Sequence, residues 1–244
     1  MPVYRIDLAY DGTRFHGYAR QPHMRTVQGV LEDALEVLTG PVQTFVAGRT
    51  DRGVHAAAQV VSFATDTPVD TALIQRSLNR RLGPEMAVLA CAEVDANFHA
   101  RFSATGRAYT YLVLDRESPD PFLAATSWHF GRRLDEGLMN RAAEHLVGEH
   151  DFASFCRRAV ARSTTREVRS AVWSRRRSDL LAFDVEASSF CHQMVRSLVA
   201  LLVEVGRGRV PPDAVAGILA TRDREVAKGA APPHGLTLVR VDYH

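Results

Sequence analysis

The sequence predicts an α+β fold made of two halves, each with the element order β-α-β-β-α-β. Apolar residues recur with strand and helix periods in alternation, and the same order of elements occurs twice along the chain. No Gly/Ser-rich linker separates the halves, so we expect them to pack together. The chain has 244 residues, of which 46% are hydrophobic and 24% charged, so it can bury a sizeable core, and disordered or fibrous classes are excluded.

The first half begins with a strand at residues 3–10, where apolar and polar residues alternate up to a turn at Asp11-Gly12. A helix is predicted at 27–39, where apolar residues follow helical spacing behind the N-cap candidate Thr26. The same criteria predict strands at 42–47 and 58–64, a helix at 71–82 and a strand at 86–94. This order is the ferredoxin-like pattern.

The second half repeats the pattern with longer connections. Its predicted elements are a strand at 106–114, a helix at about 135–147, a hairpin of 167–174 with 180–187, a helix at 190–205, a short helix from Pro211 and a strand at 236–242. We therefore expect an N-terminal half at 1–104 and a C-terminal half at 105–244, with a mixed, mainly antiparallel sheet and a central cleft. Clefts between such halves are favoured binding sites.

Several classes of protein are excluded by what the chain lacks. No apolar run approaches the roughly 20 residues of a bilayer span, and residues 1–12 do not resemble a secretory signal. Cys91, Cys156 and Cys191 lie far apart without a CxxC pair, which argues against a disulfide framework and a zinc finger. We expect a soluble cytoplasmic protein.

Positive charge gathers in one segment although the net charge is only +2. Residues 157–177 contain eight arginines and one acid, Glu167, a net of +7. Such a stripe in the C-terminal half is a candidate RNA-binding surface, because the guanidinium fork binds two phosphate oxygens at once. A solvated basic loop and strand face is the alternative.

The segment Ala47-Gly-Arg-Thr-Asp-Arg-Gly-Val-His-Ala56 follows an apolar strand and is the best candidate for chemistry. Its glycines bracket Arg49, Thr50 and Asp51 and allow backbone angles that aim a side chain. The alternative is a turn in which Asp51 bonds its own backbone. Asp51, His55 and His99 match no familiar metal-ligand spacing, and no GxSxG, GxxxxGK[ST] or GxGxxG motif is present, so hydrolase-triad and nucleotide-dependent classes lack support.

Two further polar side chains stand in apolar elements. Tyr109 lies in the strand at 106–114, where a half-buried sheet aromatic is the usual outcome. Arg196 lies beside the apolar face of the helix at 190–205. It either extends outward to solvent or has a buried acidic partner, and the pattern favours a partner.

Seven segments occur in one order along the chain: GRTDRGVHA, FHARFSA, RAYTY, GEHDFASF, FCHQMVR, VGRG and APPHGLTLVRVDY. Together they resemble the tRNA pseudouridine synthase A family over essentially the whole chain. The resemblance implies the pseudouridine synthase fold and the isomerisation of uridine to pseudouridine at positions 38, 39 and 40 of the tRNA anticodon stem-loop. It also implies that no cofactor or metal is used, and that a homodimer binds tRNA with both subunits.

The resemblance also assigns residues. Asp51 matches the catalytic aspartate, the nucleophile; Arg49 matches the arginine that helps to flip out the target base; and Tyr109 matches the tyrosine that stacks on it. Arg196 matches the arginine that pairs with the aspartate, and Leu236 matches an apolar residue that lines the base pocket.

The resemblance leaves three routes open: attack of the carboxylate on carbon 6 of the base, attack on carbon 1′ of the ribose, or a glycal intermediate. One departure is local, since Cys191-His192-Gln193 stand where a leucine and an aromatic are expected. A non-catalytic protein that binds structured RNA remains the main alternative, although no paired-aromatic signature of an RNA-recognition motif is found. A metal-dependent nuclease using Asp51 and His55 ranks last.

Overall fold

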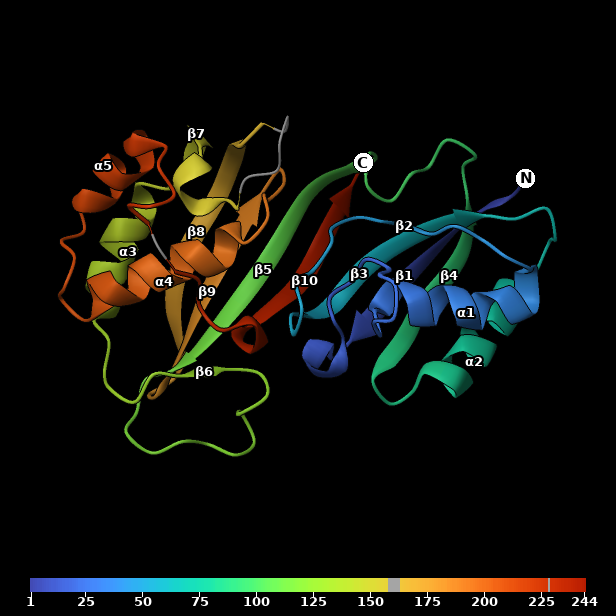
Figure 1. Ribbon diagram of the computed structural model, residues 1–244, viewed down its shortest axis with the longest axis horizontal. Coiled ribbons are helices and arrows are strands. Elements are labelled where there is room, and N and C mark those ends of the chain that lie inside the picture. The colour runs from blue at the N-terminus through green and yellow to red at the C-terminus, as the bar shows by residue number, and fades with distance from the viewer. Residues whose placement is uncertain (158–162, 228) are drawn as a thin grey trace. The chain divides into compact units, whose positions relative to one another are not determined.

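The computed structural model describes residues 1–157, 163–227 and 229–244 (Figure 1). The chain forms two compact units, of which the first comprises Met1–Thr105 with Thr237–His244 and the second Gly106–Leu236. Both units combine helices with a mainly antiparallel sheet, so the predicted α+β class is confirmed. Among the described residues, no helix is both long enough and apolar enough to cross a bilayer.

The first unit has the predicted ferredoxin-like order. Its elements are β1 (Val3–Tyr10), α1 (Val27–Thr39), β2 (Phe45–Val46), β3 (His55–Ala64), α2 (Thr71–Leu82), β4 (Met86–Val94) and β10 (Leu236–Tyr243). Strand β1 pairs antiparallel with β3 and β4, β2 pairs antiparallel with β3, and β10 pairs with β3 in parallel. Helices α1 and α2 lie side by side on one face of this sheet (Figure 1).

Local sequence signals explain these elements. Alternate residues of β1 are buried, as the period of two predicted. Helix α1 begins where the Thr26 side chain accepts a hydrogen bond from Gly29 N, and α2 begins where Asp70 accepts from Ala72 N. The apolar faces of the helices are buried through Leu31 and Ile74, among other residues.

The second unit follows the predicted order with additions. Its elements are β5 (Ala104–Leu114), β6 (Trp128–His129), α3 (Glu136–Glu144), β7 (Gly148–Asp151), β8 (Thr165–Arg177), β9 (Leu180–Ala187), α4 (Met194–Gly206) and α5 (Ala214–Thr221), with short 3-10 turns at Ala153–Phe155 and Pro233–Gly235. The strand order is β5-β9-β8-β7, antiparallel throughout, with β6 parallel to β5. Helix α3 packs on β8 and on α4, over a core that includes Trp173 and Phe183. The sequence did not reveal β6 and β7, because two to four residues are too few to show a period.

The last strand, β10, does not lie in the half of the chain where the expected division at residue 104 would place it. Residues Thr237–His244 belong to the first unit, because Thr237 and Leu238 pair with His55 and Ala56 of β3. The chain thus leaves the first unit after residue 105 and returns to it for its last strand. A division by position along the chain does not show such a return.

The cysteines also differ from expectation. Cys156 and Cys191 form a disulfide with Cα atoms 5.7 Å apart, although 35 residues separate them. The two segments are neighbours in space, since Arg157 N donates to His192 O over 2.9 Å. Separation along the sequence was therefore a poor guide to which cysteines pair. In the described part of the chain, Cys91 is the free cysteine.

Candidate active site

The candidate catalytic loop, which we define as Gly48–Val54, connects β2 to β3. Its tip is a turn in which Val54 N donates to Asp51 O over 3.1 Å, and Gly53 has a φ of 78° that favours glycine. A turn therefore exists here, closed by the backbone carbonyl of Asp51. It leaves the Asp51 side chain partly exposed and Arg49 exposed, while Thr50 is buried. A turn and a partly exposed aspartate are thus compatible in this loop.

A buried polar chain supports the loop from β1 and β3. Gln59 donates from Nε2 to the Tyr10 hydroxyl over 3.2 Å and to Gly48 O over 2.8 Å. The Tyr10 hydroxyl lies 2.8 Å from Thr50 Oγ1, and because it accepts from Gln59 its own proton is available to Thr50. Burial raises the pKa of Tyr10 to about 12, so the hydroxyl stays neutral at physiological pH. These side chains therefore hold the first part of the loop, at Gly48 and Thr50.

Two glycines let the segment after β1 approach the same loop closely. A Cβ at Gly12 would lie 2.0 Å from Val54 O, and one at Gly17 would lie 3.1 Å from Thr50 O. Gly17 also has a φ of 89°, and the next residue, Tyr18, donates from its backbone N to Thr50 O over 3.0 Å. From the sequence, only a turn at Asp11-Gly12 was predicted in this segment. Its glycines were a usable signal, but their partner loop lies about 40 residues away.

His55 is engaged by the same segment. Its Nδ1 lies 3.1 Å from both Gly12 N and Asp11 Oδ1. Burial raises the pKa of Asp11, but hydrogen bonds from Thr13 and the interaction with His55 outweigh it and lower that pKa overall. Among the residues with described positions, no group of three His, Cys, Asp or Glu side chains is arranged to hold a metal ion.

The other predicted residues lie in the second unit. Tyr109 sits in β5, nearly buried, and its ring meets that of Phe190 edge-on with centroids 5.2 Å apart. Arg196 lies on α4, where its Nε donates to Ala231 O over 2.8 Å, and Ala231 N donates back to Arg196 O over 2.9 Å. This two-way contact attaches the chain before Leu236 to the helix. It also explains why an arginine is tolerated beside an apolar helix face.

Leu236 follows a glycine that the packing requires. A Cβ at Gly235 would lie 2.6 Å from Tyr111 Cζ, and the Tyr111 hydroxyl donates to Pro232 O over 2.8 Å. Burial raises the pKa of Tyr111 above its usual range, and the charge of Arg196 partly opposes this rise. Tyr111 therefore organises the segment that carries Leu236, a role the sequence analysis did not assign to it.

The structure thus groups the predicted residues in two sets. Arg49 and Asp51 share the catalytic loop of the first unit. Tyr109, Arg196 and Leu236 belong to the second unit, and the last two are connected through one hydrogen-bonded segment.

The arginine-rich segment 157–177 is partly neutralised by ion pairs, most of them with acids from other segments. Arg158 and Arg162 lie outside the described residues. Four of the remaining arginines form ion pairs: Arg169 with Glu167 and Glu186, Arg175 with Asp115 and Glu136, Arg176 with Asp184, and Arg177 with Asp120 and Asp179. The positive electrostatic potential of this segment is therefore weaker than the number of arginines predicted.

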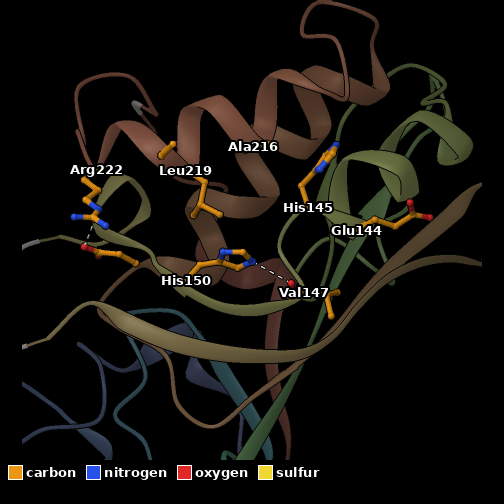
Figure 2. Close-up of a pocket in the computed structure, with 9 residues that line it drawn as sticks. Glu144, His145, Val147, His150, Ala216, Leu219 and Arg222 are labelled. Atoms are coloured by element: carbon orange, nitrogen blue, oxygen red, sulfur yellow. Dashed lines mark hydrogen bonds and ion pairs between the residues drawn. The ribbon is translucent and has the colours of Figure 1, made fainter.

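A separate pocket of about 510 Å³ opens in the second unit between α3, β7 and α5 (Figure 2). Its lining residues are Glu144, His145, Val147, His150, Asp151, Ala216, Leu219, Ala220 and Arg222. Arg222 pairs with Asp151 at 3.4 Å across its edge, and His150 Nε2 lies 3.0 Å from Val147 O. None of the predicted catalytic or substrate-binding residues lines it.

Comparison with known proteins identifies the class. A family model described as tRNA pseudouridine synthase matches residues 8–103 and 142–244, which is most of the chain. This match defines an enzyme class in which uridine is isomerised to pseudouridine. Among solved structures, a Cbf5–Nop10–Gar1 complex aligns with 82% of this chain and 45% of its own at 15% identity, with a TM-score of 0.38, too distant to bear on function.

Curated relatives match over the full length. Proteins named tRNA pseudouridine synthase A are 46% identical in Frankia casuarinae (98% of this chain, 88% of the relative) and 44% identical in Moorella thermoacetica (100% of both). Another in Shigella boydii is 40% identical over 100% of this chain and 91% of its own. The chain therefore belongs to the tRNA pseudouridine synthase A family, and the fold and activity expected from its motifs are confirmed at that level.

Proposed function

We propose that this chain converts uridine to pseudouridine at positions 38, 39 and 40 of the tRNA anticodon stem-loop, with Asp51 as the nucleophile. The full-length match to proteins named tRNA pseudouridine synthase A carries the substrate class and the reaction. The braced loop that carries a partly exposed Asp51 supports the choice of residue.

The reaction rearranges bonds without a net redox change. The bond between N1 and C1′ breaks, the uracil rotates, and a bond forms between C5 and C1′. The proton on C5 is lost and N1 gains one, so the product is an isomer of the substrate. The side chain of Asp51 serves as the nucleophile, either on carbon 6 of the base or on carbon 1′ of the ribose, or it acts in a glycal route.

The remaining residues have roles in base extrusion and binding. Flipping a stacked uridine costs about a few kcal/mol, which Arg49 offsets by taking the place of the extruded base. Stacking on Tyr109 returns roughly 1–3 kcal/mol, and Leu236 lines the apolar side of the base site. Arg196 pairs with the carboxylate of Asp51, since a guanidinium and a carboxylate form charge-assisted hydrogen bonds.

The protein would act as a homodimer in the cytoplasm, with each tRNA contacting both subunits and no cofactor or metal. The family resemblance of the sequence motifs supports this arrangement. Arginines outside the ion pairs described above are candidates for backbone contacts, which recognise the shape of RNA more than its sequence.

The test follows tritium release from tRNA labelled at carbon 5 of uridine, since forming the bond from C5 to C1′ must expel that hydrogen. Asp51→Asn should abolish release while the Kd for tRNA stays within a few-fold of wild type. Asp66→Asn, a change of an exposed aspartate in the same unit, is the matched control and should release tritium normally. Near wild-type release by Asp51→Asn would contradict the assignment. Binding of tRNA without release by the wild type would instead favour a non-catalytic RNA-binding protein.

A further inference from the structure

Three aromatic rings cluster on the surface of the first unit, outside the residues used above. His99 lies between Phe45 of β2 and Phe102, with ring centroids 4.7 Å and 4.4 Å away. Phe102 is 76% exposed and Phe45 is 40% exposed. The guanidinium of Arg101 lies 5.4 Å from the centroid of the Phe102 ring. An arginine beside an exposed phenylalanine presents a cation together with an apolar face.

The turn that carries Phe102 is rigidly closed. Ser103 N donates to His99 O over 2.9 Å, and His99 N donates to Ser103 Oγ over 3.0 Å. The backbone N of Arg101 donates to His99 Nδ1 over 3.1 Å, so the histidine ring is held by the turn that it supports. The position of the phenylalanine is therefore set by the turn itself.

The turn is also attached to the sheet. Ala100 N donates to Ser62 Oγ of β3 over 3.0 Å, and the Tyr243 hydroxyl of β10 donates to Ala100 O over 2.7 Å. Phe45 pairs with the same Ser62 in the β2–β3 ladder, which brings the second ring to this place. The exposed rings are thus ordered before any partner arrives, which lowers the entropic cost of binding.

We propose that Phe45, His99 and Phe102 form a stacking platform for an unpaired base of the RNA substrate, with Arg101 binding the adjacent phosphate. This inference rests on the proposed function for the nature of the substrate. Sequence-tolerant RNA binding combines exposed aromatic faces with cations that follow the backbone, and this cluster supplies both. The charge of Arg101 favours RNA over an apolar protein surface as the occupant.

The platform lies close to the catalytic loop along the chain. Phe45 and Asp51 are six positions apart, and such a segment spans at most about 22 Å. A base on the platform therefore lies within a few nucleotides of the uridine under attack. The platform would position the strand that flanks the target and would leave the chemical step itself unchanged.

The test compares Phe102→Ala with Phe122→Ala, a matched change of a phenylalanine that is 94% exposed in the second unit. The probe is an unmodified tRNA transcript, with Kd from filter binding at fixed salt. Phe102→Ala should weaken binding roughly 5- to 150-fold, as expected for the loss of one stacked base, and Phe122→Ala should match wild type. Phe102→Trp should restore affinity, because an indole ring also stacks.

Three further measurements distinguish the explanations. Single-turnover tritium release at saturating tRNA should stay within a few-fold of wild type for Phe102→Ala. Arg101→Ala should reduce the slope of log Kd against log salt concentration by about one, as expected for the loss of one phosphate contact. Sedimentation velocity should give the same oligomeric state for both phenylalanine variants.

The proposal is overturned if Phe102→Ala binds tRNA as tightly as wild type. It is equally overturned if that variant changes oligomeric state, because the rings would then contact a second copy of the chain. A different result would contradict the proposed function alone. In that case the wild type would release no tritium, while Phe102→Ala and Phe122→Ala would still differ in tRNA affinity.

Discussion

Replacing Gly12 by alanine should impair catalysis through a single added methyl group. The new Cβ would lie 2.0 Å from Val54 O and 2.5 Å from Val54 C, whereas ordinary van der Waals contact begins at 3.4 Å. Gly12 has no positive φ, so alanine is compatible with its backbone and the collision alone causes the effect. The methyl group meets backbone atoms, which have no alternative rotamer.

The collision cannot be relieved by Gly12 alone. Its N donates to His55 Nδ1 over 3.1 Å, its O accepts from Phe15 N over 3.0 Å, and the preceding Asp11 N donates to Glu85 O over 2.9 Å. The end of the catalytic loop must therefore move. Overpacking of this kind costs about 1–3 kcal/mol, which lowers the Tm of a chain of this size by about 2–12 °C. A displacement of about 1 Å at the reacting group costs roughly 100-fold in rate.

The assay combines thermal unfolding by circular dichroism with single-turnover tritium release well below the Tm. Gly217→Ala is the control, since a Cβ there meets nothing within 4 Å and alanine favours the helix α5. Gly12→Ala should be slower by about 100-fold with a Kd for tRNA within a few-fold of wild type. Equal Tm and equal rate for Gly12→Ala and wild type would refute the role of this close approach in positioning the loop.

Three other predictions test the stability of the fold and the proposed roles. Asp115 is fully buried and bound by two arginines, so Asp115→Asn should lower the free energy of unfolding in urea by about 3–5 kcal/mol, whereas Asp213→Asn, at a side chain 99% exposed, should leave it unchanged. Burial raises the pKa of Tyr10 from 10.0 to about 12. The neutral Tyr10 hydroxyl therefore contributes its full stabilisation below pH 10 and loses it as the pH rises towards 12. Tyr10→Phe should make the decline of Tm between pH 10 and pH 12 shallower. Arg196→Met should lower kcat for tritium release at saturating tRNA, because methionine cannot form a charge-assisted hydrogen bond to the Asp51 carboxylate; an unchanged kcat would show that Arg196 does not act on Asp51.

Much of the fold could be predicted because its signals are local. The predicted bounds of β1, α1, α2 and β4 coincide with those of the structure, since each has a clear period, and the helices have side-chain caps at Thr26 and Asp70. The motifs were equally local, so the family could be identified before any geometry was known.

Interactions between distant segments could not be predicted in this way. Eight arginines can be counted in residues 157–177, but the acids that neutralise Arg175 and Arg177 come from Asp115 and Asp120, more than 50 residues earlier. The disulfide between Cys156 and Cys191 likewise joins segments that are 35 residues apart in the sequence. Strand register and helix packing decide which residues meet, and a local pattern carries neither.

The sequence by itself therefore determined the longer elements, their order, the family and the aspartate expected to act. Only the tertiary structure decided what holds that aspartate in place: Tyr10 and Gln59 beneath the loop, and Gly12 against its end. It also decided that β10 returns to the first unit and that Phe45 meets His99 on the surface. The physical reason is that periodicity reports whether a residue is buried, whereas only the folded backbone specifies which neighbours it meets.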